Sequence, residues 1–103
     1  MAEFTRIASV TDIPKGAMRS YQVGYDHIVL CNVGGKFFAL ADECSHDAAP
    51  ISDGKLEGGN LVCARHGAKF DVVSGAVTGP PAVIGIDKYE VKVEGNDILV
   101  KPE

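Results

Sequence analysis

The sequence predicts an all-β protein, an antiparallel sandwich or barrel with a loop-rich insertion. Three observations support this fold class. The apolar residues come in short runs separated by turn residues, and the chain contains 12 glycines and 5 prolines. Two pairs of these runs flank a two-residue link that contains glycine, which is typical of β-hairpins. No segment shows a sustained helical period with a cap. With 103 residues, 46% of them hydrophobic, the chain suits one domain with a small core.

Six runs are expected to form the strands of the base. They are Phe4–Val10, Tyr21–Val23, His27–Val33, Lys36–Ala41, Tyr89–Glu94 and Asp97–Lys101. After the first run, Pro14 removes a backbone donor and Gly16 tolerates positive φ, which predicts a turn. Gly34-Gly35 joins the third and fourth runs and Gly95-Asn96 joins the last two, so each pair is expected to form a hairpin. Alternation of apolar and charged residues in the fifth run predicts one solvated face.

Residues 42–81 differ in composition from the rest of the chain. They are rich in glycine, aspartate, alanine and proline, with short apolar pieces at Leu61–Val62 and Phe70–Val73. A long loop-rich stretch in a compact domain is usually functional. We therefore expect residues 1–103 to form one domain, with residues 42–81 as an insertion organised around something other than a hydrophobic core.

Two ligand pairs lie inside this insertion. The chain reads Cys44-Ser45-His46, then 16 intervening residues, then Cys63-Ala64-Arg65-His66. Each half offers one thiol and one imidazole, and Cys₂His₂ is also a common zinc set. Zinc fingers and ribbons usually begin with two cysteines two to four residues apart, which this chain lacks. A Cys–His nucleophile would leave the second pair unexplained. Cys44, His46, Cys63 and His66 are therefore predicted to bind a metal group.

This arrangement resembles the Rieske family, whose signature is Cys-x-His, a spacer and Cys-x-x-His. The resemblance implies the Rieske iron–sulfur fold and one [2Fe–2S] cluster per chain. It also implies that Cys44 and Cys63 bind a buried iron, while His46 and His66 bind an outer iron. Downstream features agree: Phe70-Asp71 and Ser74-Gly75 resemble the stretch after the second ligand pair, and Pro80-Pro81 resembles the proline loop beside the cluster.

The sequence departs from the high-potential branch of that family. The branch has an extra disulfide-forming cysteine in each cluster loop, where this chain has Ala48 or Ala49 and Arg65. It also has a serine and a tyrosine that donate hydrogen bonds to cluster sulfurs, where this chain has Ala68 and Phe70. Because such hydrogen bonds stabilise the reduced state, their absence predicts a low potential.

The resemblance is instead to the ferredoxins of bacterial aromatic-ring dioxygenase systems, which serve aromatic hydrocarbon catabolism. It implies an electron-transfer component and not an enzyme, with a flavin-dependent ferredoxin reductase and a terminal Rieske non-haem iron oxygenase as partners. Two alternatives stay open, a small Rieske-like subunit of an assimilatory nitrite reductase and a zinc-stabilised binding module.

Charge and composition exclude other classes. A net charge of −4 and a pI near 5.3 argue against nucleic-acid binding. We expect no secretory signal and no membrane span, because no apolar stretch approaches the roughly 20 residues that a span needs. The three cysteines are then expected as thiols in a reducing cytoplasm, and the protein as a monomer.

The remaining residues of chemical interest are expected to play no part in the site. Cys31 is predicted to be a buried thiol in a strand, and His27 a surface residue at a turn. The charged residues near the ligand pairs are expected to be ordinary solvated loop residues. They are Asp42, Glu43, Asp47, Arg65 and Lys69.

Overall fold

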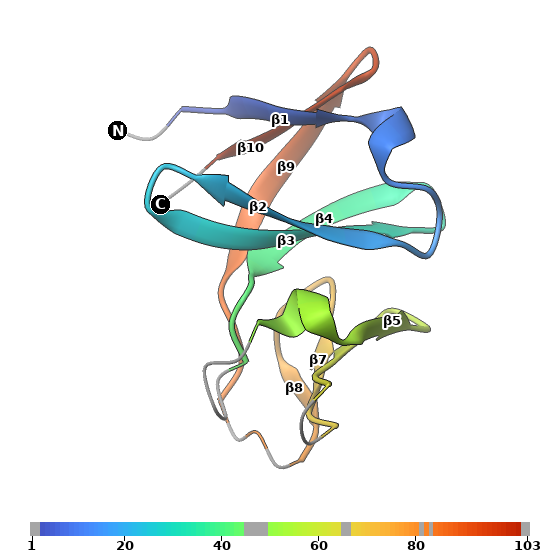
Figure 1. The fold of residues 1–103 in the computed structure, drawn as a ribbon, viewed down its shortest axis with the longest axis vertical. Coiled ribbons are helices and arrows are strands. Elements are labelled where there is room, and N and C mark those ends of the chain that lie inside the picture. The colour runs from blue at the N-terminus through green and yellow to red at the C-terminus, as the bar shows by residue number, and fades with distance from the viewer. Residues whose placement is uncertain (1–2, 45–49, 65–66, 81, 83, 102–103) are drawn as a thin grey trace.

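A computed structural model describes residues 3–44, 50–64, 67–80, 82 and 84–101, and most of its regular secondary structure is β-strand. Six strands form the base sheet, shown in the upper part of Figure 1, and all neighbours are antiparallel. In spatial order they are β1 (Thr5–Ser9), β10 (Asp97–Lys101), β9 (Lys88–Glu94), β4 (Lys36–Ala41), β3 (Asp26–Val33) and β2 (Met18–Val23). The all-β prediction is confirmed, and only two short 3₁₀ helices are present in the described residues, η1 (Val10–Asp12) and η2 (Ile51–Asp53).

The two predicted hairpins form with the predicted links. β3 pairs with β4 from Ile28 opposite Ala41 to Val33 opposite Lys36. Gly34 and Gly35 between them have φ of 62° and 96°, which a residue with a side chain adopts only at a cost. β9 pairs with β10 across the second link. The strand ends differ from the sequence prediction by one residue at either end of β1 and at the starts of β3 and β9, and β2 starts three residues earlier than expected. β1 stops at residue 9 because η1 begins at the next residue.

β3 is buried on both faces, and its side chains point alternately into two separate hydrophobic cores. Ile28 and Leu30 point into the interior of the base sheet, with Ile98 and Val100 of β10. Val29 and Cys31, on the opposite face, pack with residues of the insertion. A strand that is covered on both sides reads as a continuous apolar run, which explains the sequence Ile28–Cys31.

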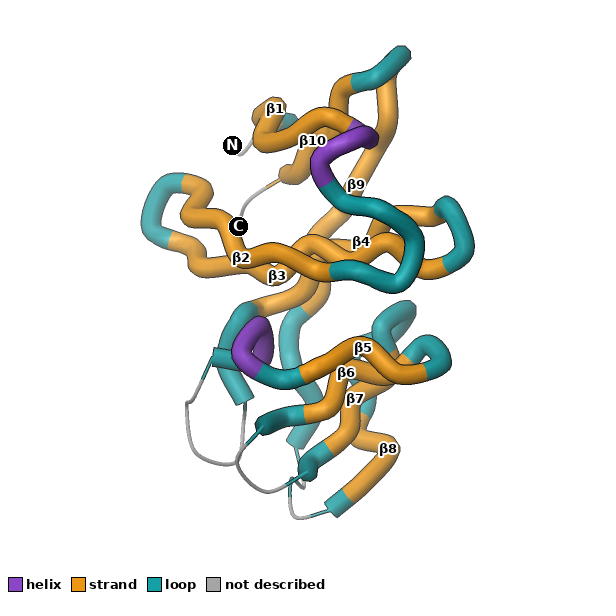
Figure 2. The backbone as a smooth tube through the Cα atoms, turned by 45° about the vertical axis from the view of Figure 1, so that its right-hand side comes forward, coloured by secondary structure: helices purple, strands orange, loops and turns teal. Residues whose placement is uncertain are grey.

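The insertion has a hydrophobic core, and the expectation that it would not is wrong. Four short antiparallel strands form a second sheet below the base sheet (Figures 1 and 2). They are β5 (Lys55–Glu57), β6 (Asn60–Val62), β7 (Lys69–Asp71) and β8 (Val77–Gly79). Ile51, Leu61 and Phe70 are fully buried between this sheet and the underside of the base. Apolar residues that are sparse in the sequence thus converge in space.

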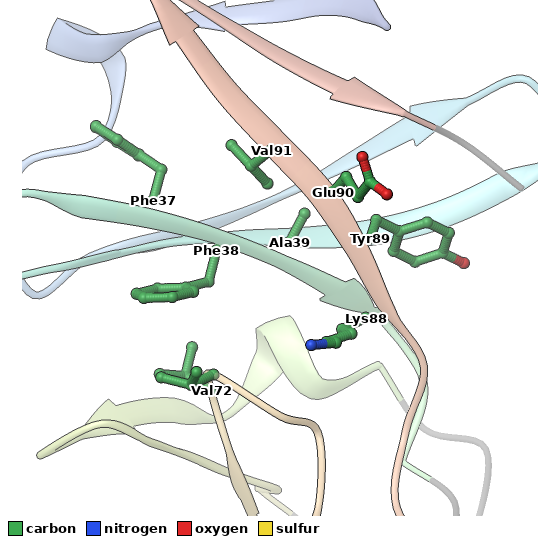
Figure 3. A pocket seen from close by; sticks show the side chains of 9 residues that line it. Phe37, Phe38, Ala39, Val72, Lys88, Tyr89, Glu90 and Val91 are labelled. Carbon is green, nitrogen blue, oxygen red and sulfur yellow. The ribbon is translucent and has the colours of Figure 1, made fainter. Parts of the chain in front are cut away.

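A narrow neck joins the insertion to the base. β4 and β9 pair through only two residue pairs, Ala39 with Tyr89 and Leu40 with Lys88. The backbone N–H of Ala41 then donates to the carbonyl of Asp87 at 2.8 Å. On the other side of the two residue pairs, away from Ala41 and Asp87, β4 and β9 diverge. They leave a pocket of about 470 Å³ there, with Phe38 directed toward Val72 (Figure 3).

No helix in the described part of the chain is long and apolar enough to cross a membrane.

Candidate metal centre

The first predicted ligand lies just beyond the neck. Cys44 follows β4 by three residues and is fully buried. The chain at this point is held by Asp42, whose backbone N–H donates to the carbonyl of His27 at 2.9 Å. The Asp42 carboxylate accepts hydrogen bonds from the backbone N–H and the hydroxyl of Ser52, each at 2.7 Å. The expectation that Asp42 is an ordinary solvated residue is therefore wrong.

Both backbone polar groups of Cys63, the second predicted cysteine ligand, form hydrogen bonds. The backbone N–H of Cys63 donates to the carbonyl of Ala68 at 2.8 Å, and its carbonyl accepts from the N–H of Gly67 at 3.0 Å. These bonds close a turn that directly follows β6 and leads into β7. The side chain of Cys63 is buried, with 2% of the residue exposed.

Cys44 and Cys63 belong to the same buried cluster of side chains. His46 and His66 lie outside the described residues. Among the described residues, no group of three or more histidine, cysteine, aspartate or glutamate side chains comes together, as expected when two of four ligands are not described. The structure thus brings together the two predicted thiol ligands, and the two imidazole ligands stay a prediction.

The surroundings of these thiols fit an iron–sulfur cluster. Thiolates are the ligands that iron–sulfur clusters require, and burial in apolar surroundings keeps water from them. A hollow of about 420 Å³ opens beside Cys63, lined on one side by Asp53, Gly54 and Lys55 and on the other by residues flanking Cys63. Cys63 is the one predicted ligand among the described residues that line this hollow, so the space lies beside the second predicted pair.

Cys31 is also buried in this cluster but differs chemically from a ligand. Burial, assisted by the negative charge of Asp42, raises the pKa of the Cys31 thiol to about 12. Because the thiolate is the form that binds metal, a raised pKa makes the Cys31 thiol harder to convert to a ligand. The prediction of a buried thiol within a strand is confirmed.

The structure describes some of the positions that are predicted to distinguish this chain from the high-potential branch of the Rieske family. Ala68 and Phe70 are fully buried in the same group of packed side chains as Cys44 and Cys63, and neither has a hydroxyl. Ala48, Ala49 and Arg65 lie outside the described residues, as do Asp47 and Pro81. Among the remaining charged loop residues, Glu43 is exposed. Lys69 is also exposed, and its Nζ lies 4.0 Å from Oε1 of Glu57.

No local sequence pattern indicates the hydrogen bonds between Asp42 and Ser52. The two residues are ten positions apart, and neither stands in a recognisable capping or turn pattern. The bonds depend on how β4 and η2 are placed by the fold, which explains why pattern reading missed them.

Comparisons with known proteins identify the family. The sequence model described as the Rieske [2Fe-2S] domain matches residues 3–90. The chain is 41% identical over 99 residues to the ferredoxin component of biphenyl 2,3-dioxygenase from Rhodococcus jostii (strain RHA1), which covers 96% of this chain and 92% of that protein.

Solved structures show the same fold. The ferredoxin of carbazole 1,9a-dioxygenase from Nocardioides aromaticivorans IC177 has a TM-score of 0.94 at 29% identity, covering 97% of this chain and 98% of that one. A chain of the complex of reduced oxygenase and oxidized ferredoxin in carbazole 1,9a-dioxygenase has a TM-score of 0.88 at 29% identity, with 93% and 99% covered. The cofactor implied by these relatives is a [2Fe–2S] cluster. Fold, buried thiols and comparisons agree, and the chain belongs to the Rieske [2Fe-2S] domain family.

Proposed function

We propose that this protein carries single electrons in an aromatic-ring dioxygenase system, from a flavin-dependent ferredoxin reductase to a terminal oxygenase. The observation that carries the proposal is its 41% identity, over nearly the full length of both chains, to the ferredoxin component of a biphenyl dioxygenase. The solved complex of a related ferredoxin with its oxygenase supports an oxygenase as the electron acceptor. The nitrite reductase alternative has no comparable support among these relatives.

Cys44, His46, Cys63 and His66 are the proposed cluster ligands, the cysteines on the buried iron and the histidines on the outer one. A bound Rieske cluster supplies a centre that gains and loses one electron. The chain's own residues determine how easily it does so. The buried side chains around Cys44 and Cys63 exclude water, and the Cys63 N–H is directed to the carbonyl of Ala68. We place the protein in the cytoplasm, where a reducing environment keeps the thiols available.

The first test is the content of iron and acid-labile sulfide. Wild-type protein purified without oxygen should hold about two of each per chain, as a Rieske cluster requires. Cys44→Ala and Cys63→Ala should lose both. Cys31→Ala is the matched control, because it removes a third buried thiol from the same cluster of side chains and should keep the iron. Stoichiometric zinc without sulfide in the wild type would contradict the proposal and favour the zinc-stabilised module.

The second test concerns the partner. Chemically reduced protein, mixed in a stopped-flow instrument with the oxidised terminal oxygenase of a biphenyl dioxygenase, should be reoxidised faster than it is by buffer alone. If the reoxidation rate does not depend on the oxygenase concentration, the placement before an oxygenase fails while the cluster assignment stands.

A further inference from the structure

The Asp42 carboxylate closes the loop that carries the first proposed ligand pair. Both its oxygens are used, Oδ1 by the backbone N–H of Ser52 and Oδ2 by the Ser52 hydroxyl, each at 2.7 Å. Hydrogen bonds to a charged acceptor are shorter and stronger than neutral ones. Asp42 and Ser52 are both half-buried, so solvent competes less for these bonds than at an exposed site. Residues 43–51, which include Cys44, are therefore fastened at both ends.

Asp42 itself is fixed to the base sheet. Its N–H donates to the carbonyl of His27 in β3 at 2.9 Å, and the preceding residue, Ala41, donates to the carbonyl of Asp87 at 2.8 Å. β3 is the most deeply buried strand of the molecule's described residues. The carboxylate is thus a rigid point of the base from which η2 is held, and η2 lies at the junction of the two sheets in Figures 1 and 2.

The other end of η2 touches the loop of the second proposed ligand pair. Gly54 follows η2, and its N–H donates to the carbonyl of Ile51 at 2.8 Å. A Cβ at Gly54 would overlap the carbonyl oxygen of Val62 and lie 3.0 Å from the backbone nitrogen of Ala64. Val62 and Ala64 are the residues on either side of Cys63. A continuous path of contacts thus runs from Asp42 through η2 to the backbone around Cys63.

We propose that Asp42 is a positioning residue for the metal centre, which sets the placement of the Cys44 loop against the Cys63 loop through Ser52 and η2. The inference rests on the proposed function, in that it takes Cys44 and Cys63 as cluster ligands. Asp42 does not touch the cluster in this role. It holds the two thiol-bearing loops in a ligating arrangement, so the ligands lose less conformational freedom when the cluster binds.

Three variants separate the hydrogen bonds from the charge. Asp42→Ala removes both bonds and Ser52→Ala removes one. Asp42→Asn removes the charge but keeps both contacts, because its carbonyl oxygen accepts from the Ser52 N–H and its amide donates to the Ser52 hydroxyl. The double variant Asp42→Ala/Ser52→Ala should be no worse than Asp42→Ala alone, because both act through the same contact.

The measurement is the rate at which purified protein loses its visible absorbance in the presence of an iron chelator, well below the unfolding temperature of every variant. Asp42→Ala should lose its cluster at least about tenfold faster than the wild type, because it loses two charge-assisted hydrogen bonds and the loss of one corresponds to about a tenfold change. Its visible circular dichroism should change as well, since that spectrum reports the arrangement of ligands around the cluster. Asp42→Asn keeps both contacts as weaker, neutral hydrogen bonds, so it should restore most of the rate and the wild-type spectrum.

Asp12→Ala is the matched control. The Asp12 carboxylate, at the end of η1, accepts a hydrogen bond of the same kind from the backbone N–H of Ser9 at 2.9 Å, at the end of β1 in the base sheet. This variant should leave cluster loss and the visible spectrum unchanged. The inference is overturned if Asp42→Ala behaves as Asp12→Ala does, or if Asp42→Asn fails to rescue. A wild-type protein without iron and sulfide would overturn the proposed function and this inference together, so the two failures are told apart.

Discussion

At the scale of single residues, two buried side chains beside the proposed centre carry information about its potential. Ala68 and Phe70 are fully buried with Cys44 and Cys63, at positions where the high-potential branch has hydroxyl groups. A hydroxyl that donates to a cluster sulfur favours the reduced state, which carries one more negative charge. Neither side chain can donate. We therefore expect a potential near the lower end of the Rieske window, roughly −150 mV, and not near its upper end of about +300 mV.

The double variant Ala68→Ser/Phe70→Tyr should raise the reduction potential, by about 60 mV for each tenfold gain in preference for the reduced state. Protein-film voltammetry on the wild type, both single variants and the double variant measures this. Ala39→Ser is the control, because it places a hydroxyl at a position 2% exposed in the base sheet, in the other core. A wild-type potential well above zero would contradict the low-potential assignment.

At the scale of elements, sequence patterns predicted the structures that are local in sequence. The two hairpins are local, because Gly34-Gly35 and Gly95-Asn96 each join strands that pair with each other. The strands β5 to β8 were not predicted, because each has three residues and is too short to show a period of two.

Contacts between distant segments were the other limit. The pairing of β4 with β9 joins residues about fifty positions apart, and no local pattern carries it. The same holds for the site. The four proposed ligands could be predicted because each cysteine stands close to a histidine in the sequence. Asp42 and Ser52 are ten positions apart, and only the folded chain brings them into contact.

The backbone of the insertion at Gly75 lies against the segment that leads into β9, with no room for a side chain between them. The N–H of Ile86 donates to the carbonyl of Gly75 at 2.8 Å, and a Cβ at Gly75 would overlap the carbonyl oxygen of Ile86. A Cβ at Gly85 would lie 2.6 Å from the carbonyl oxygen of Gly75. This close approach fixes the segment that returns from β8 toward the neck.

Gly75→Ala should therefore lower the melting temperature more than Gly58→Ala does. Both glycines have positive φ, 79° and 54°, so each alanine is strained by about 1–2 kcal/mol. Only Gly75 adds an overlap with backbone, since a Cβ at Gly58 meets nothing within 4 Å. Each further 1 kcal/mol should appear as about 4–8 °C in differential scanning calorimetry. Equal melting temperatures for the two variants would show that the close approach can relax.

At the scale of the whole molecule, we expect the two cores to respond differently to loss of the proposed metal group. Among the described residues, the buried side chains of the base interior, with Ile28, Leu30 and Ile98, are separate from the group of buried side chains that contains Cys44 and Cys63. The insertion has its own apolar contacts but only short strands, so the bound group should supply a large part of its stability.

Cys44→Ala should accordingly speed amide hydrogen exchange in β5 to β8 while the protection of β3 and β10 changes little. Hydrogen exchange followed by mass spectrometry resolves these segments. The control Cys31→Ala keeps the proposed ligands and should leave exchange in β5 to β8 near the wild-type rate. Unchanged protection of β5 to β8 in Cys44→Ala would mean that their apolar contacts alone hold the insertion.

The neck between the two sheets also has a consequence for protein engineering. The chain leaves the base at Ala41 and returns at Asp87, and a backbone hydrogen bond of 2.8 Å joins these two residues. Because β4 and β9 are antiparallel neighbours, a tight reverse turn could replace everything between them. The base would then be a plain meander from β2 to β10, with β1 beside its last strand. The insertion is thus joined to the base at one place along the chain, and a transfer to another scaffold would have to reproduce the buried surface that Val29, Cys31 and Leu40 offer it.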